Sequence, residues 1–209
     1  KVNKNLEVIS LIYKSTEYLD FIHRQLKGIT VDGWDIDYRI VANDANSEVL
    51  SRLQQLDANY TVYNDRSPED FYLNRVYRCW NHSVITSRHD NVCLVNSDML
   101  FSNNWLKNLL NYHDGKHIPC SRLVESGKMP SGQHGITKDF GQNPNNLDLR
   151  SWNTWAEGNT QVGAHLGGLY MPCIFEKETF LKSEGYPPGN IFLEKEKLVA
   201  GYPNDRPVF

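Results

Sequence analysis

The sequence predicts an α/β protein in which helices cover both faces of a mostly parallel sheet. Three observations predict this fold class. Stretches of strand length alternate with stretches of helical periodicity through residues 1–126. The strand-length stretches are almost continuously apolar, as is typical of strands buried on both faces. The composition, 40% hydrophobic and 22% charged over 209 residues, provides enough apolar side chains for one large core.

The first two strand–helix units lie near the amino terminus. Residues 7–13 are a nearly continuous apolar run, and Ser15 then opens a helix that Gly28 ends. Residues 36–42 follow as the second strand. We expect Ser47 to cap the second helix, whose apolar residues recur three and four positions apart.

Two further units complete this half of the chain. Residues 60–63 form a short third strand. The segment 67–70, Ser-Pro-Glu-Asp, is the clearest helix start in the chain, because a capping Ser, a Pro and acids in the first turn all favour it. Residues 92–95 form a buried fourth strand, and we expect Ser102 to cap the helix that follows.

The second half of the chain has a different character. Residues 127–164 are rich in Gly, Asn and Pro and show little periodicity. Because this stretch is longer than the roughly 12–15 residues usual for a structureless loop, we expect a functional loop or a partly ordered subdomain. Order is predicted to return with a strand over residues 166–174 and a helix from Glu176 to Gly185.

We expect residues 1–126 and 127–209 to be two halves of one domain. Ligands of such sheets bind at the carboxyl ends of the strands, which belong to the first half. The chain starts at Lys1 rather than Met, and it stops partway through an element. We therefore expect a chain truncated at its carboxyl end, with functional groups beyond Phe209.

Bulk properties exclude several partners. The net charge of −3 gives no reason to expect nucleic acid or an anionic membrane as the main partner. No apolar run approaches the roughly 20 residues that cross a bilayer, and no signal peptide is visible. The four cysteines lack metal-type spacing, so free buried thiols are favoured for Cys79 and Cys93. We expect a cytoplasmic protein, with a place at the membrane periphery left open.

A candidate metal site follows the fourth strand. Asn96-Ser97-Asp98 comes directly after residues 92–95, where the edge of a parallel sheet binds ligands. Mg²⁺ and Mn²⁺ prefer oxygen ligands and often take one or two carboxylates together with substrate phosphates. Taken alone, Asp98 is more often the cap of a turn than a metal ligand, since three residues are a weak motif.

The helix before that strand carries a row of cations. Arg75, Arg78 and His82 share one face, opposite the apolar residues. Arginine forks suit phosphate oxygens, whereas a solvated basic face is the plainer interpretation. Because this helix leads into the strand that ends near Asp98, we expect the cations and the carboxylate to be neighbours. Together they predict a diphosphate whose departure a metal stabilises.

Five segments, in this order, are similar to a known family pattern. Residues 11–19 look like a Pro-Thr-Tyr-Asn segment followed by Glu-Tyr-Leu, and residues 41–47 look like Val-Asp-Asp-Gly-Ser-Thr. Residues 74–81 run from Asn-Arg to a further Asn, residues 96–98 stand at the place of an Asp-x-Asp motif, and residues 167–186 look like a Gly, Phe and Gly-Gly-Phe series. Together they resemble glycosyltransferase family 2. The resemblance implies the GT-A fold, a Rossmann-like, mostly parallel sheet flanked by helices with a loop-rich acceptor side.

The resemblance implies that residues 1–126 bind a nucleotide-sugar donor. The residues it assigns to the donor site are Ile12, Tyr13, Asn43, Asp44, Arg75, Asn81 and Ser97. Of these, the Ile-Tyr pair lines the base pocket and the Asn-Asp pair hydrogen-bonds the base, commonly uracil or guanine. The arginine approaches the nucleotide or its phosphates, and the remaining Asn and Ser support the site.

The resemblance also implies a divalent metal, Mn²⁺ or Mg²⁺, held by Asp98 with Asn96. Two acids of the family pattern are replaced here. Asn96 stands in place of the first acid of Asp-x-Asp, and Asn43 stands in place of the first Asp of the Asp-Asp pair. We therefore expect one carboxylate rather than two, with the substrate holding the metal in part.

An inverting transferase needs a carboxylate base that takes the proton of the acceptor hydroxyl. In the family this acid follows the Gly-Gly-Phe-like segment. Asp205 is the candidate in this chain, and an acid beyond Phe209 is the alternative. Glu194 and Glu196 lie in a charged segment that is typical of a solvated surface.

Residues 127–209 form the acceptor side in this interpretation, with His165, Gly167 and Trp155 as acceptor-binding candidates. Flanking glycines permit a ligand to approach His165 closely, although a structural histidine is an equal alternative. The rings of Trp152 and Trp155 can stack on a sugar, and an aromatic cluster under the long loop is the alternative.

The function predicted is transfer of a sugar, hexosyltransferase-like, from a UDP- or GDP-sugar to the hydroxyl of a glycan or other acceptor. We expect the reaction to be metal-assisted and inverting and to serve glycan biosynthesis. An inactive carbohydrate- or nucleotide-binding domain of the same fold is the alternative. A nucleotidyltransferase ranks last, because no Gly-rich phosphate loop follows Tyr13.

Overall fold

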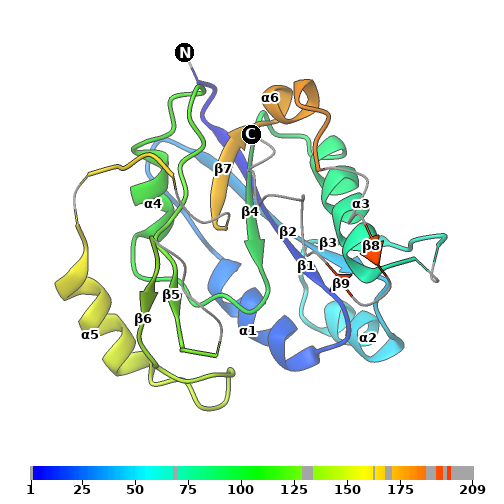
Figure 1. The fold of residues 1–209 in the computed structure, drawn as a ribbon, viewed down its shortest axis with the longest axis horizontal. Helices are drawn as coiled ribbons and strands as arrows, with labels where there is room; N and C mark the ends of the chain where they lie inside the picture. The colour runs from blue at the N-terminus through cyan, green and yellow to red at the C-terminus, as the bar shows by residue number, and fades with distance from the viewer. Residues whose placement is uncertain are drawn as a thin grey trace.

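A five-stranded sheet forms the centre of the protein, and helices lie on both of its faces (Figure 1). The computed structural model describes residues 2–67, 70–128, 134–161, 163–167, 171–186, 192–194 and 197–198. The strand order is β3-β2-β1-β4-β7. Four strands are mutually parallel, and β7 runs antiparallel to β4. The strands are β1 (Asn5–Ile12), β2 (Asp35–Asn43), β3 (Tyr60–Tyr63), β4 (Asn91–Asn96) and β7 (Cys173–Glu176). The predicted fold class, α/β with a mostly parallel sheet, is confirmed.

Six helices and four short strands accompany this sheet in the described part of the chain. The helices are α1 (Thr16–Leu26), α2 (Ser47–Gln55), α3 (Tyr72–Ile85), α4 (Trp105–Leu110), α5 (Leu149–Asn159) and α6 (Lys177–Lys182). The short strands are β5 (Val124–Glu125), β6 (Ile136–Thr137), β8 (Phe192–Glu194) and β9 (Lys197–Leu198). The parallel pair β5–β6 and α5 lie together beyond α4, to one side of the sheet (Figure 1). None of the helices in the described residues is long and apolar enough to cross a membrane.

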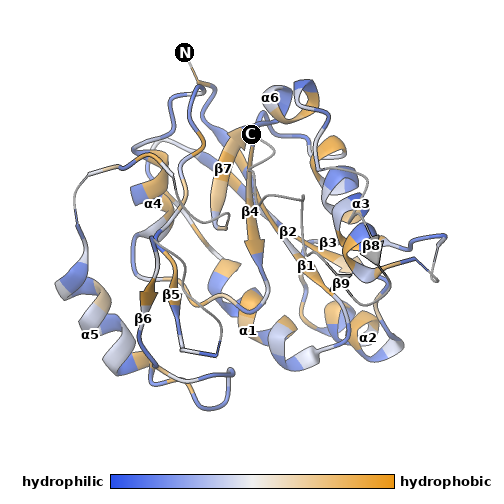
Figure 2. Cartoon of the chain, in the orientation of Figure 1, coloured by the Kyte–Doolittle hydropathy of each residue, from blue (hydrophilic) through white to orange (hydrophobic). Residues whose placement is uncertain are grey.

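Two separate cores fill the faces of the sheet, because successive side chains of a strand point to opposite faces. On one face, Leu6 and Val8 of β1 pack with the buried sides of α1, α2 and α4. On the other face, Ile9 packs with α3 and α6. Hydrophobic residues gather along the strands, whereas the helices mix hydrophobic and hydrophilic residues (Figure 2). Each fully buried Leu or Ile contributes about 1.5–3 kcal/mol, so these two layers supply most of the stabilisation of the fold.

The helix caps agree with the sequence in one case and differ in two. Ser15 caps α1 and accepts a hydrogen bond from the backbone of Tyr18, as predicted. The prediction that Ser47 caps α2 is wrong by one residue, because the side chain of Asn46 accepts from the N–H of Val49. The predicted cap at Ser102 is also wrong, since α4 begins only at Trp105 and has no side-chain cap.

The start of α3 is a further correction. The helix begins at Tyr72 rather than within residues 67–70, and it has no side-chain cap. Pro68 and Glu69 of the predicted start lie outside the described residues. Asp65 and Asp70 both bind the guanidinium of Arg78, each at 2.8 Å. These two ion pairs hold Asp65 and Asp70 against the side of α3. The tertiary contacts therefore outweigh the sequence pattern that predicts an earlier helix start.

Residues 127–164 contain more regular structure than their composition predicted. Helix α5 lies in this stretch, and the carboxylate of Asp148 caps it by accepting from the N–H of Ser151. The predicted strand over residues 166–174 is wrong in extent, because β7 is Cys173–Glu176 and Leu166 is 91% exposed. Residues 168–170 lie outside the described residues.

The predicted helix from Glu176 is confirmed, with Glu176 as the residue before α6. Gly185 follows the helix with φ +71°. A Cβ at this glycine would come within 2.7 Å of the side-chain oxygen of Asn81. The glycine is therefore required by both backbone conformation and close packing.

Cys79 and Cys93 are buried free thiols, as predicted. Burial raises the pKa of the Cys79 thiol to about 12, so it is protonated and unreactive at neutral pH. Cys173 is also buried, whereas Cys120, opposite it in an antiparallel bridge, is exposed.

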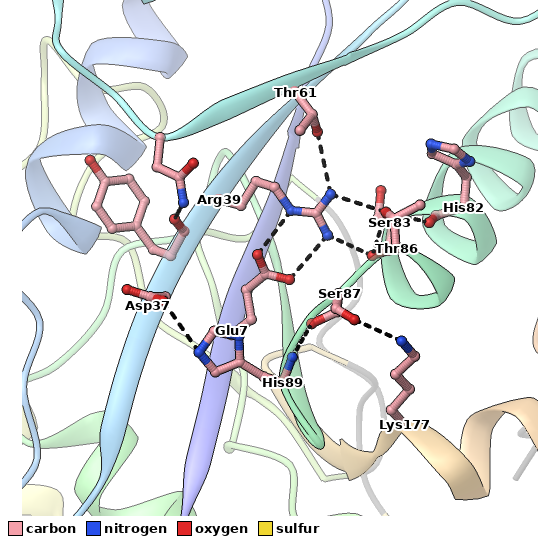
Figure 3. Close-up of polar contacts among 12 residues, drawn as sticks. Glu7, Asp37, Arg39, Thr61, His82, Ser83, Thr86, Ser87, His89 and Lys177 are labelled. Carbon is pink, nitrogen blue, oxygen red and sulfur yellow. Dashed lines mark hydrogen bonds and ion pairs between the residues drawn. The ribbon is translucent and has the colours of Figure 1, made fainter.

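A buried ion pair lies between β1 and β2 on the α3 side of the sheet (Figure 3). Arg39 and Glu7 make a bidentate contact with two N···O distances of 3.0 Å. The remaining guanidinium N–H groups donate to the carbonyl of Ser83 and to the hydroxyls of Thr61 and Thr86. All five donors of the arginine therefore have a partner, which is the condition for burying such a group at low cost.

Candidate active site

A cavity of about 790 Å³ lies beyond the carboxyl end of β4. Its volume falls in the range of small-molecule sites, and its place is where open parallel sheets bind ligands. Segments from both halves of the chain line it. Among its lining residues are Tyr77 and Trp80 of α3, Asn96 at the end of β4, Asp98 after it, Val124 and Glu125 of β5, Phe140, and Trp152 of α5.

Asp98 occupies the turn after β4, and its side chain lines this cavity. Its carboxylate makes no hydrogen bond or ion pair with any described residue. The turn is closed by the backbone instead, where the N–H of Met99 donates to the carbonyl of Asn96. Asp98 is therefore not acting as a turn cap. Asn96 is exposed and also lines the cavity, whereas Ser97 is half-buried between them and does not.

Glu125 of β5 brings a second carboxylate to the same cavity. The residue is half-buried, and its pKa is raised first by burial and second by the negative charge of Asp98. Both carboxylates thus line one cavity. The sequence reasoning missed Glu125, because an isolated acid in a loop-rich segment carries no motif.

Three cations line the cavity as well. Arg122, Lys128 and Lys138 lie on either side of β5 and after β6. None of them forms an ion pair with a described residue. The ammonium of Lys138 lies 5.5 Å from the centre of the Phe140 ring. The cavity thus contains both signs of charge without internal pairing, which suits a ligand with charged groups of its own.

An aromatic cluster forms the wall of the cavity next to α5. Phe140 meets Trp152 edge-on at 5.3 Å, and Trp155 lies 5.4 Å from Phe140 and 6.0 Å from Trp152. The indole N–H of Trp152 donates to the carbonyl of Phe101. Of the three rings, Phe140 and Trp152 line the cavity, and Trp155 packs behind them. Trp152 and Trp155 thus belong to an aromatic cluster, as the alternative interpretation of the sequence predicted. Trp152 also faces the cavity.

The predicted base pocket lies at the carboxyl ends of β1 and β2. Ile12 is buried at the end of β1, while Tyr13 after it is 45% exposed. The pKa of the Tyr13 hydroxyl is lowered, chiefly by a hydrogen bond with Lys14 and less by one with Arg75. Asn43 ends β2, is buried, and its side-chain oxygen has no hydrogen-bond partner among the residues that the structure describes. The fold thus brings these residues of separate strands to one edge.

Asp44 and Arg75 meet at the same edge, with 3.3 Å between a guanidinium nitrogen and the carboxylate. Asp44 adopts φ +48° and also accepts a hydrogen bond of 2.7 Å from the N–H of Asp65. The Nε atom of Arg75 is buried and has no partner among the described residues. Like the side-chain oxygen of Asn43, it is a buried polar group that the described fold leaves unsatisfied.

The prediction of a free cationic face on α3 beside Asp98 is wrong. Arg78 is paired with Asp65 and Asp70, and these contacts lower the pKa of both carboxylates. His82 is exposed and packs against the ring of Tyr63 at 5.0 Å. The side of α3 that lines the cavity with Asp98 is instead its apolar and aromatic side. Sequence spacing could not reveal the two aspartates, which approach through the tertiary fold.

Asn81 links α3 to the segment after α6. Its side-chain amide donates to the carbonyl of Tyr186 at 3.0 Å and accepts from the N–H of Tyr186 at 2.8 Å. The ring of Tyr186 stacks on Tyr77 at 5.4 Å, and both rings line the cavity. Asn81 therefore positions one rim of the cavity.

The remaining predicted residues lie apart from the cavity or outside the description. His165 and Gly167 are exposed and do not line the cavity. Gly167 has φ +86°, and a Cβ there would come within 3.2 Å of the imidazole of His134. Asp205 and Glu196 lie outside the described residues, and for Glu194 only the backbone of β8 is described.

Comparison with known proteins finds similarity at the level of structure. No family model matches the chain, and no curated protein matches it. The fragment 1–349 of S. aureus TarS matches with a TM-score of 0.52 at 14% identity, over 88% of this chain and 50% of that one. The same fragment in complex with UDP-GlcNAc matches with a TM-score of 0.51 at 13% identity, over 88% and 48%. The mannosyltransferase PcManGT from Pyrobaculum calidifontis, in complex with GDP-Man and Mn²⁺, matches at 0.49 and 13%, over 88% and 47%.

The chain therefore has a GT-A-like glycosyltransferase fold. It spans about half the length of the solved structures that it matches. At these identities the similarity defines the fold, and the chemistry of the site has to be argued from its own residues.

Proposed function

We propose that this chain is the catalytic part of a glycosyltransferase that moves a sugar from a nucleotide-diphosphate donor to a hydroxyl acceptor. The observation that carries the proposal is the carboxylate of Asp98. It stands at the carboxyl end of β4, unpartnered among the described residues, inside a cavity of about 790 Å³. In a GT-A-like fold this is the place for the diphosphate of the donor.

The nucleotide is proposed to bind at the neighbouring edge, against Ile12, Tyr13, Asn43, Asp44 and Arg75. The side-chain oxygen of Asn43 and the Nε of Arg75 are buried and have no partner among the described residues. Turned toward a ligand, the first would accept a hydrogen bond from an N–H of uracil or guanine, and the second would donate one to a ribose or phosphate oxygen. The supporting roles proposed for Asn81 and Ser97 follow from their places beside the cavity.

A divalent metal, Mg²⁺ or Mn²⁺, fits the donor set at Asp98. The described residues contain no group of three or more His, Cys, Asp or Glu side chains that could hold a metal without a substrate. Asp98 with the amide oxygen of Asn96 supplies hard oxygen ligands, and the donor diphosphate would complete the shell. When bound, the metal neutralises charge that develops on the leaving diphosphate.

The acceptor is proposed to bind in the part of the cavity lined by β5, α5 and the segment that follows β6. The rings of Phe140 and Trp152 offer flat apolar surface against which a sugar can stack, with Trp155 supporting them from behind. His165 and Gly167 remain acceptor-side candidates on the exposed segment between α5 and β7. A single displacement would invert the anomeric carbon. The sequence predicts Asp205 as the base of this step, and that residue lies outside the described residues.

A thermal-shift screen of UDP, GDP, UDP-GlcNAc and GDP-Man, each with and without Mn²⁺, tests the proposal. UDP-GlcNAc is included because the TarS fragment is found in complex with it. We expect one nucleotide to raise the melting temperature, and Mn²⁺ to increase that shift. Asp98→Asn should lose the Mn²⁺-dependent part, whereas Asp32→Asn, on an exposed turn away from the cavity, should keep it.

A well-folded sample that no nucleotide stabilises would contradict the donor site. Stabilisation without any turnover in the full-length protein would instead favour the alternative, a binding domain of the same fold. The two outcomes are separated by measuring release of the nucleotide diphosphate alongside binding.

A further inference from the structure

The cavity that contains Asp98 holds few acids. Among the residues that the structure describes, only Asp98 and Glu125 bring a carboxylate to its lining. An inverting sugar transfer uses one carboxylate for the metal and a different one for the proton of the acceptor. With Asp98 assigned to the donor diphosphate, Glu125 is the carboxylate left for the second task.

The backbone around Glu125 is well held. The carbonyl of Glu125 accepts a 2.8 Å hydrogen bond from the N–H of Lys138, and the carbonyl of Leu123 accepts one of 2.9 Å from Ile136. These bonds tie β5 to β6 in parallel register. A side chain on such a strand is positioned more tightly than one on a free loop.

The carboxylate itself has no internal partner. It makes no hydrogen bond and no ion pair with any described residue, although Arg122, Lys128 and Lys138 line the same cavity. The residue is half-buried, and its carboxylate is not among the buried unpartnered groups, so it is open to the cavity. A structural role would predict a partner for it, as Glu7 has in Arg39. A free carboxylate beside Asp98 is what proton transfer requires.

We propose that Glu125 is the general base of the sugar transfer, an inference that rests on the proposed function. The acceptor hydroxyl gives its proton to the Glu125 carboxylate while its oxygen forms a bond to the anomeric carbon of the donor. The bond between that carbon and the diphosphate oxygen breaks, and the nucleotide diphosphate leaves with the bonding electron pair. The aromatic wall at Phe140 and Trp152 borders the same space, so the acceptor would be stacked there while Glu125 takes its proton.

The test uses donor hydrolysis, in which water is the acceptor, because it needs no knowledge of the natural acceptor. Release of UDP from UDP-GlcNAc, or of GDP from GDP-Man, is measured at saturating donor with Mn²⁺. Glu125→Gln should lower the maximal rate by about 10²-fold or more. The KM of this variant for the donor and its nucleotide-dependent thermal shift should stay within about threefold of the wild-type values. Binding of the donor does not require the carboxylate that takes the proton.

Azide distinguishes a base from a merely structural residue. In Glu125→Ala, sodium azide should restore nucleotide release and yield the glycosyl azide, because azide attacks the anomeric carbon without a proton to lose. Glu178→Gln, an exposed glutamate on α6, is the matched control and should behave as wild type. Asp205→Asn tests the base that the sequence predicts, and it should retain more than about a third of the wild-type rate.

Three results would overturn the inference. The first is a Glu125→Gln rate within about threefold of wild type, and the second is loss of the nucleotide-dependent thermal shift in that variant. The third is a 10²-fold loss in Asp205→Asn together with azide rescue of Asp205→Ala. Failure of the proposed function looks different, since the wild-type chain itself would then release no nucleotide from any donor.

Discussion

Two groups of charged side chains in this protein are built in opposite ways. The pair Arg39–Glu7 is buried between β1 and β2, and every donor of the arginine has a partner (Figure 3). In the cavity beyond β4, Asp98 and Glu125 make no hydrogen bond or ion pair with the described residues. In the first group, the hydrogen bonds and charges are paired within the fold, which stabilises it. In the second group, the charges have no partner among the described residues and are available to a ligand.

The comparison shows how a structural charge can be told from a functional one without a bound ligand. A fully satisfied buried pair explains its own presence, because the fold supplies all the partners that it needs. Asp98 and Glu125, like the three cations of the same cavity, form no ion pair with a described residue and so add little to the stability of the fold. The proposed ligand, a nucleotide diphosphate with a metal, would give these charges their partners.

The largest effect on stability is expected from breaking the satisfied pair. Arg39→Met would leave Glu7 buried without a counter-charge and should lower the free energy of unfolding by about 3–5 kcal/mol. Urea unfolding measures this change. The double variant Glu7→Leu with Arg39→Met should recover most of the loss, because apolar side chains can replace a buried pair. A loss below about 1 kcal/mol in the single variant would mean that the network is not structural.

A smaller effect is expected from the ion pairs before α3. Arg78 lowers the pKa of Asp65 and Asp70 in the folded state, so these carboxylates stabilise the fold above their ordinary pKa. This contribution to the free energy of unfolding should be lost as the pH falls through the ordinary pKa range of carboxyl groups and below it. Because both Arg78 and Asp70 are partly exposed, we expect at most about 1 kcal/mol.

Arg78→Gln is the variant that isolates this contribution. Its melting temperature should fall less steeply than that of the wild type between neutral pH and pH 3. An equal slope in both proteins would show that the two aspartates do not depend on Arg78. Arg88→Gln, which removes an exposed arginine that has no ion pair among the described residues, serves as the control and should leave the slope unchanged.

The fold was more accessible from the sequence than the site was. Strands β1 to β4 were predicted within about two residues, because a buried parallel strand leaves a continuous apolar run. Helix α5 was missed, since only Trp152 and Ala156 of its residues are buried and the apolar period is nearly absent. The one-residue error at Asn46 reflects two adjacent residues with equal capping ability.

The site depended on contacts between distant segments. Asp98 was found because it directly follows a strand, and strand ends are where such sheets bind ligands. The pairing of Arg78 with Asp65 and Asp70 could not be predicted from helical spacing, because the two acids lie outside the helix and reach it through the tertiary fold. Glu125 could not be predicted either, since only the tertiary fold brings it and Asp98 to one cavity.

The carboxylate of Asp98, which has no partner among the described residues, is proposed to hold a metal together with a nucleotide diphosphate. Electron paramagnetic resonance of Mn²⁺ tests it directly, because the six-line signal of the free ion is lost on binding. With the wild-type chain, adding UDP or GDP should remove most of the free Mn²⁺ signal, and Asp98→Asn should leave that signal in place. Equal loss of the signal in wild type and Asp98→Asn, or no loss with either nucleotide, would contradict the account.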